Sequence, residues 1–136
     1  YKTGKNVFQP SLDYYPKLLH NARLVIGPLT TMLLEAGLFR KPVVAIAYDD
    51  DIHYTNPKNA LANYRHFEGI TDMPGIAFAH TREQMLERFL HQLTARPDAI
   101  DWARHERQLG YYLYRDEAAY ADRLQDALRQ IQQAIE

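Results

Sequence analysis

Short apolar runs that alternate with helix-forming segments constrain the fold of this chain more than any other feature. The clearest run, residues 43–48 (VVAIAY), leads directly into three aspartates. Two shorter runs lie at residues 23–26 (RLVI) and 76–78 (IAF). Apolar strands of this length are typical of parallel sheets that are buried on both faces.

The segments between these runs favour helices. Residues 30–39 suit a helix that ends before Pro42, since proline cannot continue one. Thr81 and Gln84 have the spacing of a capping box, which predicts a helix to about residue 93. Further helices are expected from Ser11 or Asp13 to about residue 19, over 58–64 and over 101–108. The last helix follows an apolar stripe formed by Tyr120, Leu124, Leu128, Ile131 and Ile135. One more strand is expected at residues 6–9.

This alternation predicts an α/β, Rossmann-like three-layer domain. We expect a parallel sheet of about four or more strands, right-handed crossovers and C-terminal helices. A length of 136 residues with 46% hydrophobic residues suits one domain, residues 1–136. The chain opens on Tyr1 in place of an initiator methionine, so we expect it to be a fragment of a longer two-domain enzyme.

Charge and composition narrow the possible partners. The net charge of −1 gives no electrostatic footprint for nucleic acid. The absence of cysteine excludes disulfides and thiolate metal sites. The longest apolar run, roughly six residues, is far short of the roughly 20 that a membrane span needs. We expect a cytoplasmic protein, with peripheral contact at the inner face of the membrane left open.

The segment from Gly27 to Thr31 has the strongest functional signal. Here a buried run ends, the chain turns, and a helix begins with two threonines. Such a helix start offers backbone N–H groups and a partial positive charge of roughly +0.5. It also follows a parallel strand, where ligands bind in open α/β sheets. We therefore predict a phosphate or diphosphate site at Gly27, Leu29, Thr30 and Thr31.

Glu35 extends this prediction. It is the only charged residue between Arg23 and Arg40, and its helix neighbours are mostly apolar. A carboxylate in such surroundings needs a partner. Glu35 follows Thr31 by four residues, so both lie on one helix face and ribose hydroxyls are a natural partner. The alternative is an ordinary threonine cap and an ion pair between Glu35 and an arginine.

Six short motifs follow one another in a fixed order between residues 21 and 83. They are Thr30-Thr31, Glu35, Lys41-Pro42, Ala47-Tyr48-Asp49, Tyr64 with Phe67, and Pro74-Gly75. This order resembles the C-terminal, donor-nucleotide-binding half of GT-B-type transferases, in particular CDP-glycerol glycerophosphotransferases and surface-polysaccharide glycosyltransferases. The later Tyr114-Arg115-Asp116 and Arg123 resemble the closing helix of that family.

The resemblance implies a function. Thr30 and Thr31 would hold the donor diphosphate, and Glu35 the ribose. The enzyme would move a sugar or glycerophosphate from a UDP-sugar or CDP-linked donor to a surface polysaccharide or related acceptor, without a cofactor. The acceptor site would belong to the missing N-terminal half, so this chain alone is not expected to turn over. Alternatives are a nucleotide-sugar epimerase and a non-catalytic binding domain.

Four more residues are candidates for the same cleft. Tyr48 and Asp49 end a neighbouring strand and could line it. Arg65 could meet a phosphate, and His66 could act as an acid or a base. A surface role is the alternative for Arg65 and His66, and beyond this candidate the catalytic residue is left unassigned.

Other polar and aromatic groups have simpler interpretations. Asp49, Asp50, Asp51 and His53 include suitable metal ligands. Consecutive acids point in different directions, however, so loop solvation or helix capping is favoured and no metal is expected. His105, with His20 and His91, is interpreted as a surface or packing residue. The aromatic patch of Tyr111, Tyr112 and Tyr114 is interpreted as packing, or as an interface with the missing half.

Overall fold

Three short strands form one parallel sheet at the centre of the molecule. The computed structural model describes residues 11–52, 56–113 and 118–135 of the chain. The strands are β1 (Val25–Pro28), β2 (Val43–Ile46) and β3 (Ile76–Ala79), in the order β1-β2-β3. Because both pairings are parallel, all three strands end at one edge of the sheet and begin at the other.

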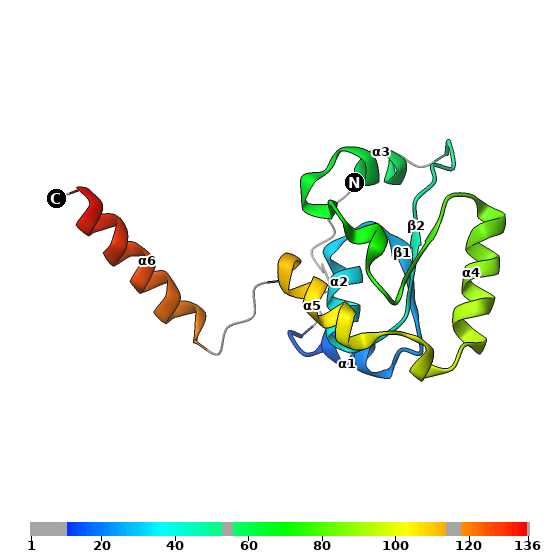
Figure 1. The fold of residues 1–136 in the computed structure, drawn as a ribbon, viewed down its shortest axis with the longest axis horizontal. Coiled ribbons are helices and arrows are strands. Elements are labelled where there is room, and N and C mark those ends of the chain that lie inside the picture. The colour runs from blue at the N-terminus through cyan, green and yellow to red at the C-terminus, as the bar shows by residue number, and fades with distance from the viewer. Residues whose placement is uncertain (1–10, 53–55, 114–117, 136) are drawn as a thin grey trace, which may run out of the picture.

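Helices lie on both sides of this sheet. Figure 1 shows α2 (Thr31–Leu38) and α5 (Trp102–Tyr112) on one side and α4 (Arg82–Thr94) on the other. Contacts agree, since α4 packs on β2 and β3 whereas α2 packs on β1, β2 and α5. The remaining helices are α1 (Tyr14–Asn21), α3 (Pro57–Asn63) and α6 (Tyr120–Ile135), with single 3-10 turns η1 (Arg65–Phe67), η2 (Ile70–Asp72) and η3 (Pro97–Ala99).

The α/β class, the parallel sheet and the C-terminal helices predicted from the sequence are confirmed. The strand expected at residues 6–9 lies outside the described residues, and the structure describes three strands. The strand expected at 23–26 was placed two residues too early. Pro28 pairs in register with Ile46 on the edge strand β1, where one side of the backbone needs no ladder partner.

The middle strand anchors the core. Val43, Val44 and Ala45 of β2 are fully buried. On one face, Leu33 and Leu34 of α2 pack into the main apolar cluster. The predicted cap of α4 also forms, since the Thr81 hydroxyl accepts a hydrogen bond from the Gln84 N–H at 3.2 Å. The Gln84 side chain accepts in return from the N–H of His80 at 2.8 Å.

Helices α2 and α5 approach each other at a glycine. His105 of α5 is buried, and its Nδ1 lies 2.6 Å from the carbonyl oxygen of Pro74, to which it donates. A Cβ added at Gly37 of α2 would lie only 2.3 Å from Nε2 of His105. His105 is therefore a packing residue, and glycine is needed at position 37 because the imidazole occupies the space of a side chain.

Figure 1 shows α6 standing apart from the rest of the molecule. Its apolar stripe includes Leu124, Leu128 and Ile131, which are about half exposed. The helices that the structure describes all fall short of the length and apolar character needed to cross a membrane.

The close approach at Gly37 leads to a stability prediction. Gly37→Ala should lower the free energy of unfolding by about 1–3 kcal/mol, since the new methyl group must displace the His105 ring. Urea unfolding measures the change. Gly110→Ala is the matched control, because a Cβ at this α5 position meets nothing within 4 Å and should stabilise the helix by up to about 1 kcal/mol. A Gly37→Ala protein as stable as wild type would contradict the packing described.

Candidate functional site

The turn between β1 and α2 presents an uncapped helix start. Thr30 has an extended backbone, with φ −143° and ψ 163°, and its side chain caps no amide of the helix. The Leu33 N–H donates to the Thr30 carbonyl at 3.1 Å. The N–H groups of Thr31 and Met32 have no acceptor among the residues that the structure describes. In α3, α4 and α5 the residue before the helix does cap it.

The predicted residues of this turn differ in exposure. Leu29 is buried beneath the turn, whereas Thr30 and Thr31 are exposed. Gly27 lies within β1, and the nearest atom to a Cβ added there would be 3.9 Å away, on Leu33. Leu29 therefore anchors the turn, and the two threonines lie at the surface.

A cavity of about 260 Å³ brings Thr31 together with Arg65 and His66. These three residues were singled out separately in the sequence, and they come from α2 and η1. The remaining walls are Leu34 of α2 and the end of α5, with Tyr111, Tyr112 and Leu113. A helix start and a guanidinium therefore line one cavity, an arrangement that suits an anion.

Burial of neighbouring side chains holds η1 in place. Phe67 and Ile70 are buried in the main core, and the His66 ring lies over Phe67 with centroids 4.1 Å apart. The Tyr112 hydroxyl donates to the Glu68 carbonyl oxygen at 2.6 Å. These contacts tie η1 to the core and to α5, while Arg65 and His66 remain exposed.

Glu35 is half-buried one turn beyond Thr31. It is not among the residues that line the cavity of Thr31, Arg65 and His66. No arginine within residues 11–52, 56–113 and 118–135 forms an ion pair with Glu35. The alternative of an internal arginine partner therefore finds no support in the described part of the chain.

Tyr48 and Asp49 line a separate cavity of about 440 Å³ at the ends of β2 and β3. Asp51, Lys58 and His80 complete its polar walls. Asp49 Oδ1 accepts a hydrogen bond from the Lys58 N–H at 3.2 Å, so this acid supports the start of α3. The sequence analysis did not anticipate Lys58 or the convergence of His80, because they reach this edge from different segments.

The aspartate run makes local contacts. The Asp50 carboxylate accepts from the Ile52 N–H at 3.1 Å, and Asp51 has a left-handed backbone with φ 58°. Among the described residues, no group of three His, Cys, Asp or Glu side chains is arranged to hold a metal ion. His53 lies outside those residues.

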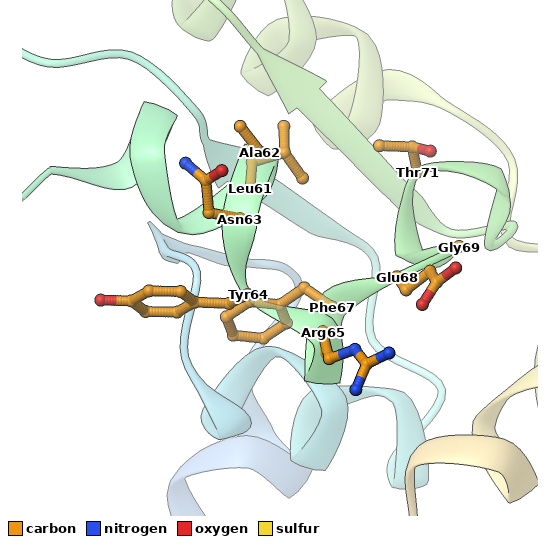
Figure 2. A pocket seen from close by; sticks show the side chains of 9 residues that line it. All are labelled: Leu61, Ala62, Asn63, Tyr64, Arg65, Phe67, Glu68, Gly69 and Thr71. Atoms are coloured by element: carbon orange, nitrogen blue, oxygen red, sulfur yellow. The ribbon is translucent and has the colours of Figure 1, made fainter.

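A third cavity, of about 390 Å³, follows α3, η1 and η2. Figure 2 shows Arg65 and Glu68 pointing to the same side of this segment, whereas the Tyr64 ring points the other way. One cationic and one anionic side chain line the cavity, so it offers an anion no net charge. The cavity that contains Thr31 is lined by Arg65 and by no carboxylate, so it is the better candidate for an anion.

Comparison with known protein families, with curated proteins and with solved structures finds no match to this chain. The assignment of function therefore depends on the residues and their geometry.

Tyr112 makes this region sensitive to alkaline pH. Burial raises the pKa of its phenol above the ordinary value of 10.0, and the nearby Tyr111, Asp72 and Glu68 act in the same direction. Well below pH 10.0 both the folded and the unfolded protein carry a neutral phenol. As the pH rises further the unfolded chain ionises first, so this contribution to stability is lost as the pH passes through the raised pKa.

We therefore expect Tyr112→Phe to reduce the alkaline loss of stability. At about pH 8 the variant should be less stable by about 1 kcal/mol, because it lacks the bond to Glu68. Above about pH 10 the gap to wild type should narrow. Thermal unfolding across this range measures both effects. Tyr15→Phe, at an exposed tyrosine of α1, should follow the wild-type profile. Parallel curves for wild type and Tyr112→Phe would show that Tyr112 ionisation has no part in stability.

Proposed function

We propose that this chain is the donor-nucleotide-binding domain of a GT-B-type transferase. The enzyme would transfer a sugar or glycerophosphate from a nucleotide-diphosphate donor to a surface-polysaccharide or related acceptor in the cytoplasm. In this proposal the domain is Rossmann-like, with a parallel sheet of about four or more strands. The observation that supports the proposal best is the uncapped start of α2, which shares a cavity with Arg65 and His66.

The diphosphate would bind at the start of α2. The N–H groups of Thr31 and Met32 and the hydroxyls of Thr30 and Thr31 supply donors, and the helix adds its partial positive charge. Arg65 supplies a planar guanidinium that can donate two parallel hydrogen bonds to a phosphate. Such charge-assisted bonds are about twice as strong as neutral ones, so Arg65 should contribute most of the affinity.

The ribose would bind beside Glu35. One helical turn, about 5.4 Å along the axis, separates this carboxylate from Thr31. A carboxylate accepts hydrogen bonds at both oxygens and can take the two hydroxyls of one ribose. Glu35 has no ion-pair partner among the described residues, so this binding would satisfy a half-buried charge.

His66 is the candidate acid or base for the transfer step. It lines the same cavity as Thr31 and Arg65, and histidine changes its charge near neutral pH. The acceptor site would come from the other half of the enzyme, so the chain studied alone would bind its donor without turning it over.

The diphosphate proposal predicts a loss of binding in two variants. Arg65→Gln and Thr31→Ala should each weaken UDP or CDP binding, by about tenfold or more for the arginine, which corresponds to ~1.4 kcal/mol. Isothermal titration calorimetry measures the affinity, and unfolding curves check that the fold is kept. Arg88→Gln, at an exposed arginine of α4, is the matched control and should bind as wild type does. Absence of nucleotide binding to wild type at millimolar concentration would refute the proposal.

The ribose proposal is tested by combining the Glu35→Ala variant with a nucleotide that lacks the 2′-hydroxyl. Wild type should bind UDP more tightly than 2′-deoxy-UDP, by about tenfold, because a hydrogen bond to a charged group is worth ~1.5–3 kcal/mol. Glu35→Ala should bind both nucleotides with equal affinity. Calorimetry on the four combinations gives the coupling between Glu35 and the 2′-hydroxyl. If Glu35→Ala preserves the preference for UDP, the ribose lies elsewhere.

A further inference from the structure

A cavity of about 310 Å³ lies at the opposite edge of the sheet, where the strands begin. It opens between the ends of α1, α2 and α4 and the start of α5. Four cationic side chains line it, although the whole chain has a net charge of −1. They are Arg23, Arg40, Lys41 and Arg96, and the apolar part of the wall includes Ile100 and Trp102.

Basic residues often follow helices because they neutralise the terminal carbonyl groups. At the end of α2 the backbone already satisfies these carbonyl groups. The Arg40 N–H donates a hydrogen bond to the Gly37 carbonyl oxygen at 2.9 Å, and the Lys41 N–H donates one to the Ala36 carbonyl oxygen at 3.1 Å. This pair of bonds is a Schellman motif. Among the four cations, Arg23 has a bond to a helix carbonyl, that of Leu93 at 2.6 Å. Capping therefore does not explain the whole cluster.

The backbone conformation of Arg40 is a second, independent indication of a functional site at this edge. This backbone is left-handed, with φ 50°, at the position of the motif where glycine is usual. A residue with a side chain costs of order 1 kcal/mol there, and such strain gathers at functional sites. The Arg40 side chain donates two hydrogen bonds to Glu106 of α5, at 2.7 and 2.9 Å, which fixes the guanidinium at the cavity wall.

Two of the four cations have no carboxylate partner in the part of the chain that the structure describes. Arg40 pairs with Glu106, and Arg96 pairs with Asp98 at 2.8 Å. Arg23 and Lys41 form no ion pair with any residue that the structure describes, and Lys41 is half-buried. A lysine ammonium and an arginine fork that line one cavity are a suitable combination for a phosphate group.

We propose that this cavity binds a phosphate-bearing ligand. Arg23 and Lys41 hold the phosphate, and the rest of the ligand packs on Trp102 and Ile100. The site lies at the opposite edge of the sheet from the start of α2, so it is separate from the donor site and does not rest on the proposed function. A soluble phosphorylated molecule and a phospholipid headgroup share this chemistry.

Trp102 provides the measurement, because it is the only tryptophan in the chain. Titration of the full chain with pyrophosphate at low ionic strength should change the Trp102 emission with a saturable profile. Lys41→Gln and Arg23→Gln should each raise the apparent Kd by about tenfold. Lys17→Gln and Arg88→Gln are matched controls that should leave it unchanged. The affinity of the UDP site that Arg65→Gln weakens should be the same in wild type and Lys41→Gln, since the donor site does not involve Lys41.

Vesicles distinguish the two sources of phosphate. Cosedimentation with phosphatidic acid vesicles, but not with pure phosphatidylcholine vesicles, and its loss in Lys41→Gln would identify a lipid headgroup. Pyrophosphate binding without cosedimentation would identify a soluble ligand. No change in Trp102 emission at millimolar pyrophosphate, or an equal response in wild type and Lys41→Gln, would overturn the proposal. Arg23→Gln removes a hydrogen bond to the Leu93 carbonyl and could unfold the protein. The Lys41 side chain makes no such bond to the backbone of the described residues, so Lys41→Gln tests the proposal even in that case.

Discussion

Burial of β2 between two parallel neighbours is the constraint on which the rest of the structure depends. Val43, Val44 and Ala45 leave no surface exposed, so both faces of the middle strand must be covered by helices. Parallel pairing then sends every strand in one direction. With the faces covered, the sheet itself is open to a ligand only at the two edges where strands begin and end. The candidate sites lie at those edges for this reason.

The pair of helices α2 and α5 links the two edges. Helix α2 begins at Thr31 in the proposed donor cavity and ends beside Lys41 in the cationic cavity. Helix α5 runs the opposite way, from Trp102 in the cationic cavity to Tyr112 in the donor cavity. Their close approach at Gly37 therefore sets the walls of both cavities at once.

The order of elements could be predicted from the sequence because its signals are local. Apolar runs, the proline after α2 and the Thr81 cap each act within a few residues. The end of β1 was misplaced because Gly27-Pro28 has the composition of a turn, whereas pairing with β2 extends the strand through it. That pairing joins residues far apart in the chain, so a local pattern does not contain it.

In the candidate site, too, local features could be predicted from the sequence and long-range contacts could not. The hydroxyls at the start of α2 were predicted, since a helix start after a buried strand is a local feature. The meeting of Arg65 and His66 with Thr31 depends on the burial of Phe67 and on the bond from Tyr112 to Glu68, which spacing does not reveal. The four cations at the other edge come from three separate turns, so no local spacing joins them.

Helix polarity makes the two edges electrostatically different. At the carboxyl edge the start of α2 directs N–H groups toward a ligand, so the helix itself assists an anion and one guanidinium can complete the site. At the amino edge α1, α2 and α4 end, and their carbonyl groups oppose an anion. A phosphate site at that edge therefore needs more side-chain cations than carboxylates. It also needs the last carbonyl groups of the helix to accept backbone hydrogen bonds already. The cluster of Arg23, Arg40, Lys41 and Arg96 around the Schellman motif of α2 meets both requirements.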